Sequence, residues 1–235
     1  VFDGTVGDYA SDFCQKHFLE HLAASKSFQQ LCEALRVGGG GRGDGGGGDA
    51  NSGIVPAQVA PLAGDALKEA LASTDAALLS ACARLKNDYA SSTAVVVMVT
   101  RALVTVAHLG DSRVAIGKSG QTAAFVTNDH KADSPGERRR IESKGGSVVY
   151  LHQGKPFIRG GDFTRRQAQG DRPMQLNYSR AVSAPFGLFL SCVRSVRCDP
   201  TCNLSRRCRA ERSSVRLGNF VLAMLLSAIR HGTRI

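Results

Sequence analysis

The 235-residue sequence contains no tryptophan and no apolar run that could cross a bilayer. Its most apolar late segment, Phe220 to Ile229, is far shorter than the roughly 20 residues that a membrane-spanning helix needs. No secretory signal opens the sequence, and because it begins at Val1 instead of Met, we expect a fragment or a processed product. The seven cysteines are an odd number without a pairing pattern. We therefore expect reduced thiols in an intracellular protein, cytoplasmic or nuclear, without a membrane span.

The net charge of +10 is unevenly distributed along the chain. Residues 182–235 carry nine arginines, no lysine and two acids, whereas residues 1–181 carry twenty-one basic and eighteen acidic residues. A large positive surplus is typical of proteins that bind nucleic acids or membrane surfaces. The arginines are not interleaved with aromatic residues on which bases could stack. We therefore expect no nucleic-acid partner.

The most regular hydrophobic pattern starts at Leu103. Alternation over Leu103–Leu109 predicts a strand with one buried face, and Gly110-Asp111-Ser112-Arg113 interrupts it. Apolar and β-branched runs at Val114–Ile116 and Ala123–Val126 predict two further strands. Upstream, the periodicity predicts two helices and one fully apolar strand, in the ranges Asp8–Ala24, Pro61–Lys86 and Ala94–Val99.

A helix with clear boundaries follows these strands. Ser134 is placed to cap its N-terminus, Pro135 suits the first helical position, and Glu137 completes a capping box. Gly145-Gly146 is typical of a helix C-terminus, after which Ser147–Leu151 predicts another strand.

Four of these motifs occur in the order found in one family. Gly110-Asp111-Ser112-Arg113, then Asp129-His130-Lys131, then Glu137-Arg138-Arg139-Arg140-Ile141 and Gly145-Gly146 resemble the metal-dependent (PPM, type-2C) Ser/Thr protein phosphatases. The resemblance covers residues 1–181, about the N-terminal two thirds of the catalytic domain. It implies an α+β fold, an αββα sandwich of two antiparallel sheets flanked by helices, here incomplete at its C-terminal side.

The resemblance also implies a metal site at the start of the chain. Asp3-Gly4-Thr5-Val6-Gly7 matches the family's Asp-Gly-His-Gly-Gly loop. By that match, Asp3 is the catalytic carboxylate that bridges two Mg²⁺ or Mn²⁺ ions, and the Gly4 carbonyl reaches the second ion. Such hard cations prefer oxygen ligands. Thr5 replaces the family's histidine, the proton donor to the leaving alcohol, and threonine cannot carry that role near neutral pH. Val6 replaces the first of the two glycines.

Two more aspartates belong to this expected centre. Asp129 matches an aspartate near a third, weaker metal position, and Asp111 is expected beside the centre as a supporting carboxylate instead of a ligand. The family also has acidic residues before its Asp-Gly loop and aspartates in its C-terminal third, which this sequence does not supply. We therefore expect an incomplete metal site.

The function implied by the resemblance is metal-dependent hydrolysis of phosphoserine and phosphothreonine in proteins, a signalling activity, by a monomer. As the sequence stands, it is a truncated copy whose own catalytic activity is left open. The alternative is a pseudophosphatase that binds phosphoproteins or regulates a partner without hydrolysis, and the Thr5 replacement supports it.

Other motifs receive plainer interpretations. His17 and His21 have a zinc-compatible spacing but no third ligand, so we favour a solvated or half-buried helix face. Arg138–Arg140 point in different directions on a helix, and we favour a solvated face over a phosphate site. The glycine-rich insert 37–53 is a linker between helices, and Gln153–Gln175 is a long polar loop.

Residues 182–235 form a basic Arg- and Cys-containing tail that we do not expect to be part of the fold. The match to the family's Ser-Arg-Ala segment ends between Ala181 and Val182, inside the core instead of at a domain boundary. Valine codons begin with GT, as most introns do, so we hypothesise intron read-through. The four tail cysteines lack the close pairs of a structural zinc site; they are Cys192, Cys198, Cys202 and Cys208.

Overall fold

The computed structural model describes residues 1–5, 7–37, 56–87, 90–100, 103–117, 123–170, 173, 175–182, 192–197, 216–217 and 220–221. Most of the predicted glycine-rich linker, Val6 and three of the four tail cysteines lie outside the described residues. Among the helices of the described part, none is long and apolar enough to span a membrane.

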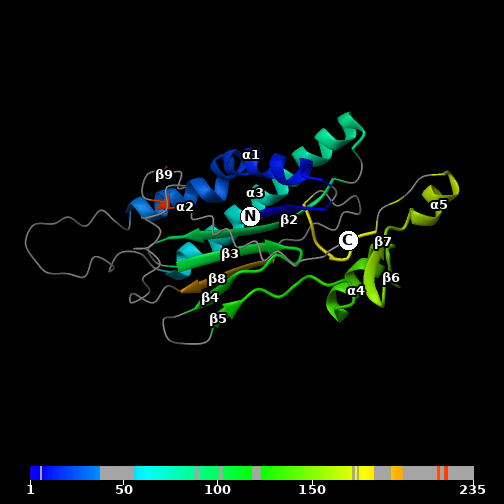
Figure 1. The fold of residues 1–235 in the computed structure, drawn as a ribbon. Helices are drawn as coiled ribbons and strands as arrows, with labels where there is room; N and C mark the ends of the chain where they lie inside the picture. Colours follow the sequence, from blue (N-terminus) through cyan, green and yellow to red (C-terminus); the bar gives the residue numbers. More distant parts are fainter. Residues whose placement is uncertain are drawn as a thin grey trace, which may run out of the picture.

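The larger of the antiparallel sheets forms the centre of the molecule (Figure 1). Its strands are β1 (Phe2–Gly4), β2 (Ser92–Val99), β3 (Leu103–Leu109), β8 (Cys192–Arg197), β9 (Arg216–Leu217) and β10 (Phe220–Val221). β2 and β3 pair along their length, from Ala94 opposite Leu109 to Val99 opposite Val104. β1 and β10 pair with β2, and β8 pairs with β3. The predicted strand at Ala94–Val99 is confirmed and begins two residues earlier, at Ser92.

Three helices cover one face of this sheet (Figure 1). They are α1 (Tyr9–Ala24), α2 (Lys26–Val37) and α3 (Pro56–Leu85). The first helix is confirmed, whereas the sequence analysis predicted no helix in the range of α2. The third begins at Pro56 and contains Pro61, so the predicted start at Pro61 was wrong. The extra turn buries Val59, and its packing against the core offsets the backbone hydrogen bond that Pro61 cannot donate.

The other face of the sheet packs against a second, two-stranded sheet. β4 (Ala115–Gly117) and β5 (Ala123–Val126) form this antiparallel pair. Val104 and Val106 of β3 lie in one apolar cluster with Val114 and Ile116, beside and within β4. All seven residues of β3 are therefore buried, and the prediction of a single buried face was wrong because helices cover one side and a sheet the other. Two sheets with flanking helices confirm the predicted sandwich.

A smaller unit follows β5 along the chain. It contains α4 (Pro135–Ser143), the hairpin of β6 (Ser147–Leu151) and β7 (Lys155–Arg159), and α5 (Phe163–Ala168). The predicted polar loop Gln153–Gln175 was wrong for two of its parts, because it contains β7 and α5. The hairpin forms because Ile158 of β7 is buried in a small core with Ile141 and Leu176.

The predicted C-terminus of α4 is correct, whereas the predicted capping box at its N-terminus is wrong. Its C-terminus is confirmed: Gly145, at φ +77°, and Gly146 donate their N–H groups to Glu142 and Ile141, both at 3.0 Å. Its N-terminus lies at Ser134 as predicted, but the Ser134 side chain makes no capping hydrogen bond. The capping box does not form because Glu137 pairs with arginines instead.

The expected boundary at Ala181 and Val182 does not coincide with the end of strand pairing. Val182 is fully buried, and it exchanges two backbone hydrogen bonds with Ser92, at 2.9 and 3.2 Å. Further along the tail, β8 pairs antiparallel with β3.

Candidate functional site

The predicted metal loop is held at one end of β2. Antiparallel pairing places Asp3 opposite Thr93 and Gly4 opposite Ser92. The Asp3 side chain is exposed and makes no hydrogen bond or ion pair with any described residue. A Cβ atom at Gly4 would lie 2.2 Å from the carbonyl oxygen of Gly7, so only glycine fits this turn. The structure therefore presents a free carboxylate from a tightly turned loop.

Tyr178, which the sequence analysis did not single out, contacts this loop although it lies 173 residues after Thr5 in the sequence. The buried Tyr178 hydroxyl contacts Thr5 Oγ1 and lies 3.4 Å from Ser91 Oγ. Burial raises the pKa of Tyr178 to about 12, and the negative charges of Asp111 and Asp3 add to the rise. The phenol therefore stays protonated, and it lies within electrostatic reach of both carboxylates.

Asp111 and Asp129, the other predicted acids, lie beside basic side chains. Asp129 receives two hydrogen bonds from the Arg113 guanidinium, at 2.6 and 2.8 Å. Lys131 Nζ lies 3.0 Å from Asp111 Oδ2 and 3.5 Å from Asp129 Oδ2. The Arg113 hydrogen bond lowers the pKa of Asp129. Burial acts in the opposite direction, and the charge of Lys131 lowers the pKa further. Both carboxylates therefore have basic partners, and Asp129 is held in its ionised form.

These contacts test how well the acids fit a divalent cation. Asp3 offers free carboxylate oxygens, and the Gly4 turn leaves no room for a side chain. Both oxygens of Asp129 are engaged by Arg113, so a cation there would have to compete with a guanidinium. Within the described residues no three His, Cys, Asp or Glu side chains form a group that could hold a metal ion. Asp3 and Gly4 fit such an ion, and the Asp129 assignment stays a prediction.

Two stacked imidazoles support the turn that carries Asp111. The His108 and His130 rings lie 4.5 Å apart between centroids, and His130 Nδ1 accepts the Gly110 N–H at 3.2 Å. Burial, together with the neighbouring His108, lowers the pKa of His130 to about 4. His130 is thus neutral at physiological pH, as a hydrogen-bond acceptor must be. The Asp129-His130-Lys131 motif does not by itself indicate that His130 supports this turn, because Gly110 lies 20 residues earlier in the sequence.

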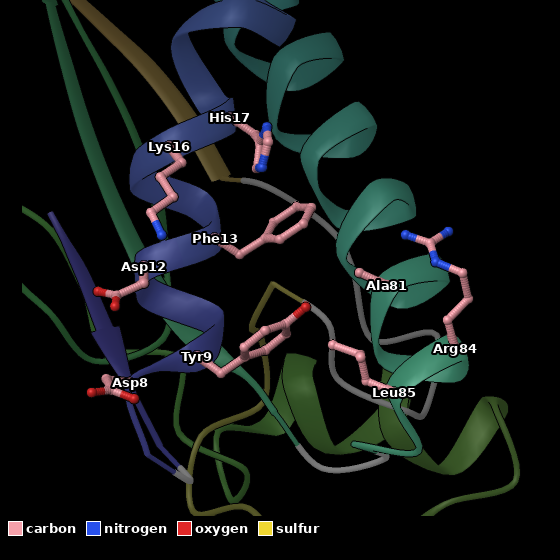
Figure 2. Close-up of a pocket in the computed structure, with 9 residues that line it drawn as sticks. All are labelled: Asp8, Tyr9, Asp12, Phe13, Lys16, His17, Ala81, Arg84 and Leu85. Carbon is pink, nitrogen blue, oxygen red and sulfur yellow. The ribbon is translucent and has the colours of Figure 1, made fainter.

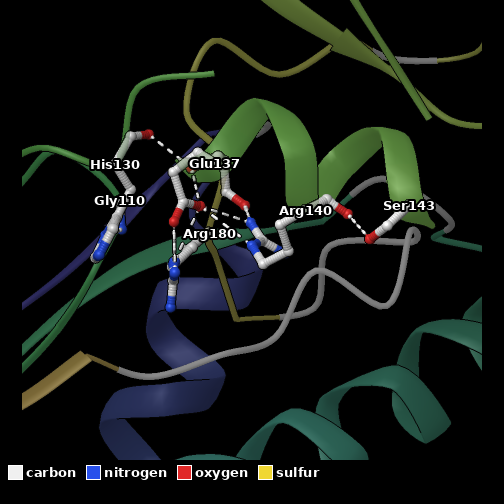
Figure 3. A network of polar contacts seen from close by, with 7 residues as sticks. Gly110, His130, Glu137, Arg140, Ser143 and Arg180 are labelled. Carbon is white, nitrogen blue, oxygen red and sulfur yellow. Dashed lines mark hydrogen bonds and ion pairs between the residues drawn. The ribbon is translucent and has the colours of Figure 1, made fainter. Parts of the chain in front are cut away.

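A partly buried ionic cluster fixes the segment that carries Tyr178 (Figure 3). Glu137 Oε2 lies 2.7 Å from Arg140 Nη2 and accepts a hydrogen bond from Ser179 Oγ at 2.6 Å. The Arg180 Nε atom lies 3.0 Å from both Glu137 oxygens. Arg138 pairs instead with Glu142 on the surface. Arg138 and Arg140 therefore contact different partners. The prediction of a single solvated face for Arg138–Arg140 was wrong because Arg140 is only 13 % exposed.

A groove of about 450 Å³ separates the start of α1 from the end of α3 (Figure 2). His17 lies in it, 41 % exposed and 4.4 Å from the Phe13 ring between centroids. One turn on, His21 Nδ1 lies 2.9 Å from Thr74 Oγ1. The groove is also lined by Asp8, Tyr9, Asp12, Lys16, Ala81, Arg84 and Leu85. The two histidines thus contact neighbouring side chains on a half-buried helix face, as we expected.

Comparison with known proteins extends this picture. A model of the family Protein phosphatase 2C matches residues 1–184. Protein phosphatase ppm-1.A of Caenorhabditis elegans is 30% identical over 151 residues, 63% of this chain and 28% of that protein. Probable protein phosphatase 1N of Mus musculus is 38% identical over 125 residues, 50% of this chain and 30% of that protein. The matches thus span less than a third of these relatives' lengths.

Solved structures agree with the fold. A serine-threonine phosphatase 2C from Toxoplasma gondii superposes with a TM-score of 0.70 at 38% identity, over 85% of this chain and 63% of that chain. A C. elegans sex determining protein superposes with a TM-score of 0.53 at 18% identity, over 84% of this chain and 39% of that chain. The second likeness, at such low identity, concerns the fold alone.

Proposed function

The chain belongs to the protein phosphatase 2C family, and we propose that it contributes to Mg²⁺- or Mn²⁺-dependent hydrolysis of phosphoserine and phosphothreonine in proteins. One observation supports this most directly. The Asp3 carboxylate is exposed and has no cationic partner among the described residues, whereas Asp111 pairs with Lys131 and Asp129 pairs with both Arg113 and Lys131. The resemblance assigns the bridging ligand to that same residue.

The chain's own residues would divide the work at this loop. When bound, a divalent cation supplies an acidified water for attack on phosphorus and offsets negative charge on the phosphate. Asp3 provides oxygen ligands of the kind that Mg²⁺ and Mn²⁺ prefer. Gly4 keeps the turn tight, because a Cβ there would meet the Gly7 carbonyl oxygen, and by the family match its carbonyl would reach the second ion. Lys131 holds Asp111 next to the loop without removing its charge.

Thr5 limits what this site can do alone. A threonine hydroxyl can donate a hydrogen bond, but it does not release a proton near neutral pH. We expect the leaving alcohol to take its proton from solvent, to which Thr5 is exposed. A pseudophosphatase that binds phosphoproteins without hydrolysis is the alternative that Thr5 supports, and the family relationship does not favour it. Phosphoprotein substrates and an intracellular setting belong to the same proposal.

Replacing Asp3 tests the proposed function. We expect Asp3→Asn to abolish Mn²⁺ binding in titration calorimetry, together with any Mn²⁺-dependent hydrolysis of a phosphothreonine peptide. The matched control is Asp12→Asn, because Asp12 is an exposed carboxylate of α1 that lies outside the loop. Mn²⁺ binding that survives Asp3→Asn would contradict the proposal. Mn²⁺ binding by the wild-type chain without any hydrolysis would favour the pseudophosphatase instead.

A further inference from the structure

The backbone around Tyr178 is fixed by contacts with three distant segments. Tyr178 forms an antiparallel bridge with Lys131, and the Ser179 N–H donates to the His130 carbonyl at 2.7 Å. Val182 pairs with Ser92, as described above. Glu137 accepts hydrogen bonds from Arg180 Nε (Figure 3) and from Ser179 Oγ. Tyr178 therefore belongs to the rigid part of the molecule.

The Tyr178 ring has little room to move. Its side chain is 4 % exposed and packs in the apolar cluster of Ala132, Ile141, Ile158, Leu176 and Ala181. Only its hydroxyl projects toward the loop, where it meets Thr5 and Ser91. Hydroxyl groups can each donate one hydrogen bond and accept others, so the three groups can satisfy one another.

The loop needs such an external contact because of Gly4. Glycine leaves the backbone conformationally free, and Gly4 separates Asp3 from Thr5. Strand pairing fixes the chain up to Gly4, which lies opposite Ser92, and beyond it the Thr5 N–H donates to the Ser91 carbonyl at 2.9 Å. Contact with the Tyr178 hydroxyl then fixes the Thr5 side chain. The direction of the Asp3 carboxylate depends on both sides of this glycine being held.

We propose that Tyr178 is a positioning residue, which orients the Asp3–Gly4 loop through the hydroxyl of Thr5. This inference rests on the proposed function, because the loop that Tyr178 orients is the one assigned to metal binding. It also gives Thr5 a role in this chain other than proton donation. Thr5, which departs from the family's pattern, is the residue that the Tyr178 hydroxyl contacts.

Hydroxyl-deleting variants test the contact from both ends. Thr5→Val and Tyr178→Phe each remove one hydroxyl with little change of shape. We expect each to raise the Mn²⁺ concentration for half-saturation about tenfold, as loss of a ligand-orienting contact does, measured by the electron paramagnetic resonance of free Mn²⁺. Both should also speed hydrogen–deuterium exchange in peptides covering residues 2–9. The double variant should bind Mn²⁺ no more weakly than the weaker-binding single variant, because both substitutions remove the same contact.

Conservative variants supply the controls. Thr5→Ser keeps the hydroxyl and should restore wild-type Mn²⁺ affinity and exchange. Tyr150→Phe removes a hydroxyl from an exposed tyrosine of β6 and should change neither. Because Thr5 is exposed, Thr5→Val remains informative even if Tyr178→Phe fails to fold.

The two proposals can fail separately. Additive effects of the two substitutions, or unchanged Mn²⁺ affinity and exchange in both, would overturn the positioning role of Tyr178. A wild-type chain that binds no Mn²⁺ would overturn the proposed function. In that case faster exchange in Thr5→Val and Tyr178→Phe supports the loop contact, and unchanged exchange overturns it as well.

Discussion

Substituting Glu137 by glutamine should destabilise the fold in a way that depends on pH. Glu137 is 12 % exposed and contacts both Arg140 and Arg180, which are 13 % and 17 % exposed. Glutamine has nearly the same shape but no charge, so Glu137→Gln removes the negative charge that both partly buried guanidinium groups contact. Removing one partner of a buried ion pair is costly for this reason.

The pKa of Glu137 sets the size of the effect. Burial alone would raise this pKa, but hydrogen bonds from Arg180, Ser179 and Arg140 outweigh it and lower the pKa from 4.5 to about 2. At about 1.4 kcal/mol for each tenfold change in proton affinity, that difference corresponds to about 3 kcal/mol of stability at neutral pH. The folded pKa is the lower one, so this stability is present above about pH 4.5. It is lost as the pH falls toward 2.

Chemical unfolding between pH 7 and pH 3 measures this prediction. The difference in unfolding free energy between wild type and Glu137→Gln should be about 3 kcal/mol at pH 7 and should shrink below pH 4.5. The control is Glu142→Gln on the same helix, because solvent screens its surface pair with Arg138 and the pair should contribute little to stability. A difference that is independent of pH, or no larger than that of the control, would refute this reasoning.

Two further predictions concern the backbone and the tail. Gly110→Ala should cost about 1–3 kcal/mol in thermal unfolding, because Gly110 lies at φ +89° and a Cβ would meet Thr93 Cγ2 at 2.6 Å. Gly136→Ala, with no atom within 4 Å of its Cβ position, is the control and should cost nothing. For residues 182–235, we propose intron read-through and expect the mature transcript to leave this frame after the Ala181 codon. Sequencing the message decides the matter, and uninterrupted reading into Val182 with detected tail peptides would end the idea.

Sequence patterns predicted those elements whose signals are local. The ends of α4 follow from Pro135 and from Gly145-Gly146, because capping depends on residues within one turn of the helix. The strand at Leu103–Leu109 follows from its alternation, but burial on both faces does not. That depends on a helical layer and a second sheet far away in the sequence. The strand β7 was missed because its polar ends and Pro156 conceal one buried residue, Ile158.

Side-chain partners were harder to predict than elements. A capping box was the natural local interpretation of Glu137, yet its charge is used by Arg180, 43 residues later in the chain. Tyr178 is unremarkable in sequence, since a tyrosine in a polar stretch carries no signal for contact with Thr5. Family resemblance supplied the aspartates, but it could not supply a tyrosine that contacts the threonine standing in place of the family's histidine.

The charges around the candidate site show which carboxylate is left for a ligand. Three acids, Asp3, Asp111 and Asp129, face two bases, Arg113 and Lys131. The bidentate contact assigns Arg113 to Asp129, and the shorter of the two Lys131 distances assigns that lysine to Asp111. The remaining negative charge therefore belongs to Asp3, which is exposed. Because a partly buried ion pair yields its partner only at a cost in free energy, a cation would bind first at Asp3. That is the carboxylate whose direction the Thr5–Tyr178 contact controls.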